Sequence, residues 1–164
     1  MTDQIQRMFC DAQDRINDAD ILAGSLETLS DSQAIIRILA FEVLLKCALL
    51  VCGQKAKANH NYNKLWLGLP GYVQQEIMEV AANHRTGYAD LTNLEKLFKW
   101  YQYIFEKARY HYELYENYSL AEQAELGEYW NSIGAPIEEA VVQCHPNELA
   151  CLTAGLIAFI EKRI

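Results

Sequence analysis

The stretch from Ile35 to Cys52 is apolar at nearly every position, and it constrains the fold more than any other part of the sequence. Three charged residues, Arg37, Glu42 and Lys46, divide it, so that it contains no run of 18 apolar residues and is not predicted to span a membrane. The remaining interpretation is a helix that is apolar nearly all round. Such a helix lies at the centre of a helical bundle or against a partner subunit.

The rest of the chain also shows helical patterns, and we find no convincing alternation of the kind that predicts a β-strand. Gly53 is suited to close the apolar helix, Ser119 and Glu122 have the spacing of a capping box, and Pro146 suits the first turn of a last helix. The sequence therefore predicts an all-α antiparallel bundle of about five major helices plus short helices, in a single domain over residues 1–164.

Composition limits the class of protein. The chain has 14 Lys and Arg against 22 Asp and Glu, a net charge of −8, which disfavours indiscriminate binding to nucleic acid or to an anionic membrane, although a local basic patch remains compatible. Five cysteines without a CxxC motif, and a polar N-terminus unlike a secretory signal, favour reduced thiols in a cytoplasmic protein. Cys144, His145 and Cys151 match no zinc spacing, so we predict no metal and no cofactor.

Glu42 and Lys46 are four residues apart, which is the spacing of a salt bridge along a helix. Because their neighbours on the predicted helix are leucines, both charges are expected to be at least partly buried, and burial of each charge is costly unless it is paired. Two interpretations stay open at this point: a paired bridge that anchors the bundle, or part of a functional pocket.

A long helix is predicted to start at Asp90 or at a Thr92-x-x-Glu95 capping box and to run to about Asn117. Together with Tyr118 directly after it, it contains nine of the 18 aromatic residues. One face of it carries polar residues at helical spacing, and within that face Arg109 is followed directly by Tyr110 and His111, with Glu113 one turn further on. The face is either a solvated surface with ion pairs between neighbouring turns, or a site where an arginine beside aromatic rings captures a phosphate and stacks on a base.

Two stretches together resemble the HEPN superfamily of small all-helical domains associated with nucleotides and RNA. The first, residues 40–66, reads AFEVLLKCALLVCGQKAKANHNYNKLW, and the second, residues 105–113, reads FEKARYHYE. The resemblance covers about residues 10–118 and leaves residues 119–164 as a C-terminal helical elaboration. It implies a compact antiparallel bundle that is often dimeric. It also implies a link to metal-independent ribonucleases, which use an Arg and a His spaced R-x4–6-H and assembled across a dimer interface.

No arginine of this chain is followed by a histidine at that spacing, so the standard nuclease motif of the family is absent. His111 lies only two residues beyond Arg109, and two such side chains on a helix diverge by about 200°. The catalytic residues are therefore unknown, with His60, Arg109 and His111 as candidates. The ligand-binding candidates at the positions that resemble the family are Glu42, Lys46, His60, Arg109, Tyr110 and Glu113.

Three functions follow as hypotheses. The first is a HEPN-like binding or interaction module, dimeric, with a pocket for a nucleotide or an RNA phosphate; the resemblance alone implies a toxin–antitoxin or phage-defence setting with a toxin or antitoxin as protein partner. The second is a divergent metal-independent ribonuclease in which His60 or His111 acts with Arg109. The third is a purely structural bundle in which the six candidate residues form a buried network. A homodimer is expected because the apolar Ile35–Leu50 surface, if uncovered, exceeds what a monomer normally exposes.

Overall fold

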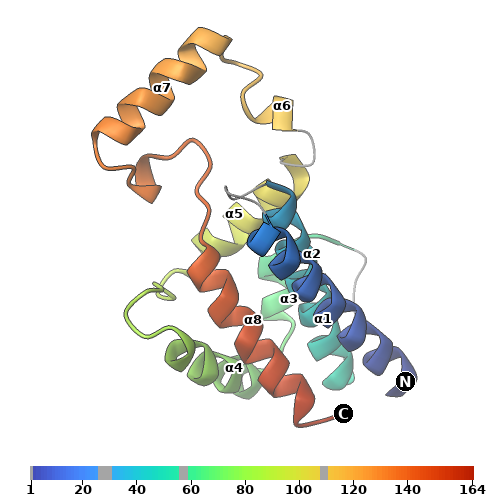
Figure 1. Cartoon of the computed structure of the whole chain (residues 1–164). Coiled ribbons are helices and arrows are strands. Elements are labelled where there is room, and N and C mark those ends of the chain that lie inside the picture. The colour runs from blue at the N-terminus through green and yellow to red at the C-terminus, as the bar shows by residue number, and fades with distance from the viewer. Residues whose placement is uncertain (1, 26–30, 56–58, 108–110) are drawn as a thin grey trace.

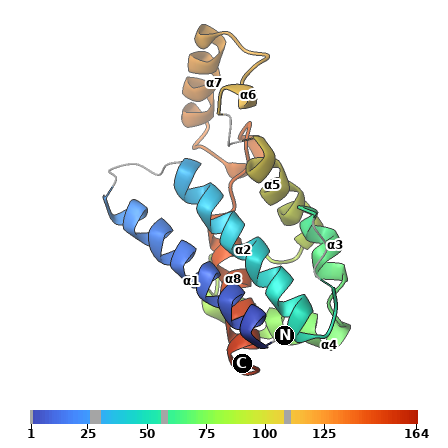
Figure 2. The ribbon, with the colours of Figure 1, turned by 90° about the vertical axis from the view of Figure 1, so that its right-hand side faces the viewer.

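Helix α2 (Asp31–Val51) is the central element of the fold, as its apolar sequence predicts, and the computed structural model describes it together with residues 2–25, 52–55, 59–107 and 111–164. It packs against α1 (Thr2–Ser25), α3 (Tyr62–Leu67), α5 (Leu94–Lys107) and α8 (Pro146–Glu161). Figure 1 shows α1 and α2 as neighbouring antiparallel helices, and Figure 2 shows α8 behind α2 and α3 to its side.

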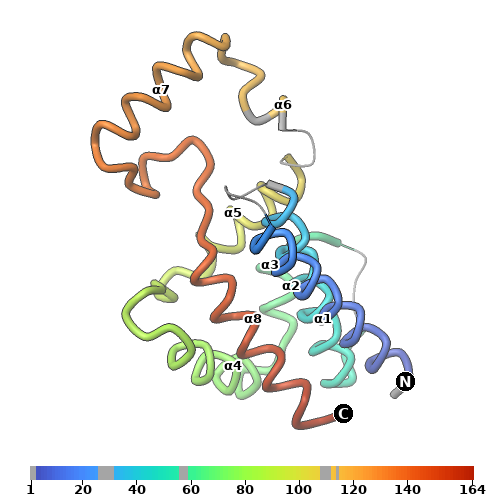
Figure 3. The backbone as a smooth tube through the Cα atoms, in the orientation of Figure 1, coloured from blue at the N-terminus to red at the C-terminus, as the bar shows by residue number. Residues whose placement is uncertain are grey.

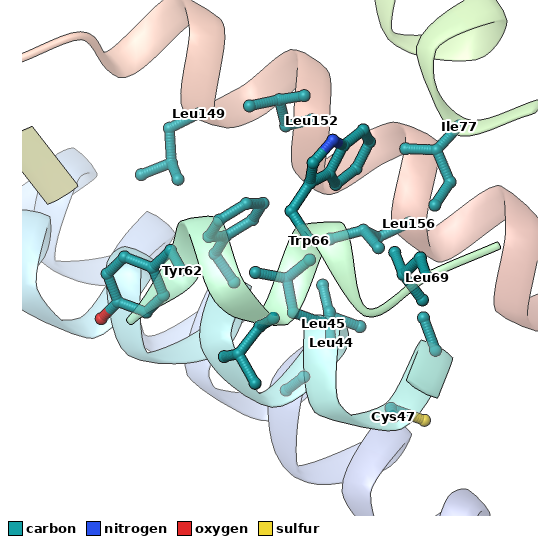
Figure 4. Packing of buried hydrophobic residues seen from close by; sticks show 14 of the residues in the cluster. Leu44, Leu45, Cys47, Tyr62, Trp66, Leu69, Ile77, Leu149, Leu152 and Leu156 are labelled. Atoms are coloured by element: carbon teal, nitrogen blue, oxygen red, sulfur yellow. The ribbon is translucent and has the colours of Figure 1, made fainter. Parts of the chain in front are cut away.

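The side chains of α2 are buried by the protein's own helices. Its fully buried residues are Ala40, Phe41, Leu44, Leu45, Cys47 and Ala48. The Phe41 ring contacts Tyr62 of α3 and both Phe98 and Tyr101 of α5, at centroid distances of 6.1, 6.1 and 5.9 Å. Figure 4 shows the same core from close by, with leucines of α8 facing those of α2 across Trp66. The centre of the bundle is therefore covered within one chain, so an uncovered α2 no longer argues for a second subunit.

Helix α4 (Gly71–His84) lies against α8, and a glycine sets how closely the two approach. A Cβ atom added to Gly155 of α8 would lie 2.4 Å from the carbonyl oxygen of Ile77 and 2.8 Å from its Cγ2. Since real Cβ atoms are not found at such distances, only glycine fits here without movement of a backbone. Arg163, just beyond the end of α8, joins the same part of α4 by binding Glu76 at 2.7 Å.

The helix ends follow the sequence signals in most cases. Gly53 adopts a φ of 72° after α2, in the left-handed region that favours glycine, and Pro146 begins α8. Ser119 and Glu122 form the predicted capping box at the start of α7 (Leu120–Ser132), with the Ser119 backbone N–H 2.7 Å from the Glu122 carboxylate. The prediction of an all-α fold is confirmed: no strand occurs in the parts of the chain given above.

The long helix predicted from about residue 90 to Asn117 is wrong at both ends. Helix α5 begins at Leu94, because the side chain of Asn93 caps it by accepting from the Lys96 backbone N–H at 3.0 Å. The Thr92 hydroxyl is instead bonded to Asp90 at 2.6 Å. Helix α6 (His111–Leu114) is followed by a turn over residues 115–117, and residues 108–110 lie outside the described residues.

We call residues 111–143 the arm; it comprises α6, α7 and the short 3₁₀ helix Ile137–Glu139. Both ribbon views place α7 apart from the bundle, whereas α6 contacts α5, and the trace in Figure 3 follows the chain from α7 back to the start of α8. No residue of α7 is buried, and Leu120 is 84% exposed. The arm contains seven glutamates and no Lys or Arg. The rest of the chain therefore contains the other 15 acidic residues and all 14 basic residues.

No helix within the described residues is both long enough and apolar enough to cross a membrane. All five cysteines are free, and two of them, Cys47 and Cys151, are buried. Burial raises the pKa of the Cys47 thiol to about 11, and its Sγ lies 3.6 Å from the Ile5 carbonyl oxygen. Cys47 is therefore a packed thiol that joins α2 to the start of α1.

Candidate functional site

Glu42 lies at the centre of the candidate site, on the face of α2 that points toward the loop before α3. Its side chain is only 4% exposed, yet both carboxylate oxygens have partners. Lys46, one turn further along α2, donates to Oε1 at 2.6 Å. The Nδ1 atom of His60 lies 3.1 Å from Oε1 and 2.9 Å from Oε2. We call Glu42, Lys46 and His60 the Glu42 cluster.

His60 is held from three sides although its side chain is 52% exposed. Its ring packs on Phe105 of α5, with centroids 5.0 Å apart and planes inclined by 37°. The backbone beside it is fixed by Asn61, whose side chain accepts from the Lys64 N–H at 2.8 Å and so caps α3. The imidazole is consequently positioned by a loop, a core aromatic ring and a buried carboxylate together.

The Glu42 contact determines how the imidazole can act. A carboxylate only accepts hydrogen bonds, so the Nδ1 atom of His60 carries the proton and Nε2 is the atom that remains for chemistry. Nε2 makes no hydrogen bond within the described part of the chain, and the ring is open to solvent. Pairs of this kind orient histidines that bind or transfer protons, because the carboxylate fixes both the tautomer and the ring. Lys46 balances the buried charge of Glu42.

A hollow of about 480 Å³ lies next to this cluster, between the end of α2 and α3. Its lining includes Asn59, which precedes His60 in the chain, and the two lysines Lys55 and Lys64. No hydrogen bond or ion pair of either ammonium group is found in the part of the chain that the structure describes. The hollow thus has two lysines in its lining, one from the loop after α2 and one from α3.

The second group of predicted site residues is only partly placed. Arg109 and Tyr110 fall outside the described residues, and of His111 the structure gives the backbone at the start of α6 but not the side chain. Glu113 is described, and its carboxylate is 3.3 Å from the ammonium of Lys107 at the end of α5. This hydrogen bond raises the pKa of Lys107. Lys107 was not among the sequence candidates.

Phe105 is the contact that sequence reasoning missed. Its helical spacing assigns it to the core stripe, and it is indeed 6% exposed, but its ring also supports His60. One signal pointed to it, because Phe105 is the first residue of the stretch FEKARYHYE that resembles the HEPN pattern. The contact between His60 and Phe105 therefore joins the two resembling stretches.

A second polar group surrounds the start of α8. His145 is 7% exposed, its backbone carbonyl accepts from the Tyr101 hydroxyl at 3.0 Å, and its Nδ1 lies 4.0 Å from Glu148. Glu148 in turn accepts from the Asp90 backbone N–H at 2.9 Å. Within the described ranges no three His, Cys, Asp or Glu residues are arranged to hold a metal ion. The group joins α5, α8 and the loop before α5.

His145 makes stability depend on pH. Burial lowers its pKa below the ordinary value of 6.5, against the opposing charge of Glu148, while Lys96 lowers it further and Glu138 and Asp90 raise it. The unfolded chain therefore takes up a proton at a higher pH than the folded one. The free energy of unfolding that neutral His145 contributes is fully present above pH 6.5 and is lost as the pH falls toward the folded pKa.

We expect urea midpoints of the wild type to fall between pH 7.5 and pH 5.5, and those of His145→Gln to fall less over the same range. The variant serves as its own comparison because the other three histidines stay in place. Equal slopes in the two proteins would contradict this role of His145.

Comparison with known proteins adds no assignment: no family model matches the chain, and neither a curated protein nor a solved structure does.

Proposed function

We propose that the protein is a HEPN-like helical binding module that holds a phosphate group of a nucleotide or of RNA at the Glu42 cluster. The observation that carries the proposal is the half-exposed imidazole of His60, fixed at Nδ1 by a carboxylate that is itself 4% exposed. A carboxylate–lysine bridge that served only to anchor the bundle would not need a half-exposed imidazole on the same carboxylate.

The surrounding charges support a phosphate as the ligand. When protonated, the imidazole donates from Nε2 to a phosphate oxygen while Glu42 accepts from Nδ1. Lys55 and Lys64 line the adjacent hollow and Lys46 binds Glu42 at 2.6 Å, so the elements that form the site carry three lysines. The overall charge of −8 fits local capture of one phosphate better than the wrapping of a long RNA.

The setting of this module rests on the HEPN resemblance. It implies a toxin–antitoxin or phage-defence protein of the cytoplasm, a toxin or antitoxin as partner, and a homodimer. The dimer now rests on that resemblance alone, because the apolar face of α2 is covered by α1, α3, α5 and α8 of the same chain.

A metal-independent ribonuclease is the second candidate, and the same nitrogen favours it. With Nδ1 protonated, Nε2 of His60 can accept the proton of a ribose 2′-hydroxyl while the 2′-oxygen attacks the phosphorus. The bond to the 5′-oxygen then breaks and that oxygen takes a proton from an acid or water, which leaves a 2′,3′-cyclic phosphate. In this reaction Arg109 would stabilise the charge of the phosphorane.

The replacement His60→Gln is expected to weaken binding of a short fluorescent RNA about tenfold, because one charge-assisted hydrogen bond is lost. Fluorescence anisotropy at fixed ionic strength measures it. Lys99→Gln is the matched control: it removes an exposed positive charge that pairs with Glu95 at 2.8 Å, on a face of α5 away from the cluster, and should leave the affinity unchanged.

Cleavage of the same RNA in EDTA separates the two candidates. Cleavage by the wild type that disappears in His60→Gln and in Arg109→Ala would establish the ribonuclease. Binding without cleavage supports the binding module. Equal affinity of the wild type and His60→Gln would remove both and leave a structural role for the cluster.

A further inference from the structure

A pocket of about 570 Å³ is lined by residues of α1, α2, the end of α4 and α8. None of its lining residues belongs to the Glu42 cluster. Its volume falls in the range of about 300–1,000 Å³ that is typical of small-molecule sites. We call it the Arg37 pocket.

Two arginines from different elements line this pocket. Arg37 of α2 donates from Nη2 to the Asp20 carboxylate at 2.6 Å, and Arg85, directly after α4, donates from Nη1 to the Asn147 side chain at 2.8 Å. A guanidinium has five N–H donors, and these are the side-chain hydrogen bonds that each makes in the described part of the chain. Both groups thus retain donors for a ligand.

The charge of the lining is positive. Arg37 and Arg85 are joined there by His84, and Asp20 is the only acid among the described lining residues. The Asp20 side chain is 61% exposed, so its pair with Arg37 is a surface ion pair that contributes little to stability. An anion can therefore replace Asp20 on Arg37 at little cost.

The lining also has an apolar part. Ile16 of α1, with Leu149 and Ile157 of α8, provides a surface for a flat or weakly polar body. A pocket whose lining combines two arginines with apolar side chains matches an anionic group attached to such a body, and guanidinium donors fit the oxygens of a phosphate.

We propose that the Arg37 pocket binds a small phosphomonoester of mononucleotide size, with the phosphate on Arg37 and Arg85 and the body against Ile16, Leu149 and Ile157. This site is independent of the Glu42 cluster. The protein then holds two phosphate sites, one for the proposed RNA or nucleotide ligand and one for a separate small molecule.

Isothermal titration with AMP tests the pocket, because AMP joins one phosphate to a planar body. Adenosine and inorganic phosphate are the comparison probes, and each should bind at least tenfold more weakly than AMP. Arg37→Gln and Arg85→Gln should each weaken AMP binding about tenfold. Arg163→Gln, an arginine at the far end of α8 that pairs with Glu76, should bind AMP as the wild type does.

A variant that keeps every charge controls for a loss of AMP binding caused by misfolding of the arginine variants. Ala154→Leu adds bulk to the pocket wall and should abolish AMP binding. His60→Gln removes any AMP binding at the Glu42 cluster, so the same comparisons made in a His60→Gln background report the Arg37 pocket alone. The proposal is overturned if His60→Gln gives no AMP binding at millimolar concentration, or if Arg37→Gln and Arg85→Gln, each combined with His60→Gln, bind AMP as His60→Gln alone does.

Discussion

Replacement of Gly155 by alanine is expected to lower the free energy of unfolding by about 3 kcal/mol, because overpacking a close helix contact forces a backbone shift. The added Cβ atom would lie 2.4 Å from the carbonyl oxygen of Ile77, and the next nearest atom belongs to the same residue. A carbonyl in the middle of α4 cannot turn aside as a flexible side chain can. Helices α4 and α8 must therefore separate, and urea denaturation followed by circular dichroism measures the loss.

Gly127→Ala is the matched control for this prediction. Gly127 lies in α7, where nothing comes within 4 Å of an added Cβ atom, and alanine has the higher helix propensity. This variant should not lower the free energy of unfolding. If Gly155→Ala is as stable as the wild type, the tight approach of α4 and α8 is wrong.

The second large effect is expected at Glu42. Glu42→Ala leaves the ammonium of Lys46, which is 19% exposed, without its carboxylate, and removing one partner of a buried ion pair typically costs about 3–5 kcal/mol. It also releases His60 from its carboxylate contacts at 2.9 and 3.1 Å. We expect both a lower urea midpoint and weaker RNA binding, measured on the same preparation.

The double variant Glu42→Leu/Lys46→Leu separates the two consequences. Replacing both charges by apolar side chains of similar size is often neutral or stabilising, so the urea midpoint should return close to the wild-type value. RNA binding should stay weak, because His60 still lacks its anchor. Recovery of both properties would show that the cluster is an anchor of the bundle and nothing more.

The fold could be predicted from the sequence where local signals act alone. The capping box at Ser119, the turn at Gly53 and the start of α8 at Pro146 each depend on a few neighbouring residues. The start of the long helix could not be predicted in this way. The choice between Asp90, Thr92 and Asn93 as the N-cap of this helix depends on Glu148, because Glu148 lies 58 positions from Asp90 and binds the Asp90 backbone N–H.

The candidate site likewise has parts that the sequence predicts and parts that it does not. The burial of Glu42 and its bridge to Lys46 follow from spacing along one apolar helix, and both are confirmed. The contact of His60 with Glu42 joins residues 18 apart through a loop, and only the family resemblance grouped them beforehand. The pair of Arg37 and Arg85 escaped prediction altogether, because tertiary packing brings α2, α4 and α8 to one pocket and no sequence pattern connects them.

The placement of charge in the arm has a consequence for how other molecules meet this protein. Seven glutamates lie in the arm, while the rest of the chain is close to neutral. The molecule therefore has an electric dipole that runs from the bundle to the arm, with its negative end at the arm. A polyanion that diffuses toward it is repelled at one pole and is turned toward the other before any contact forms. At physiological ionic strength this orienting field acts over about 8 Å. Encounter rates with RNA should therefore be shaped at first by the charge of the arm.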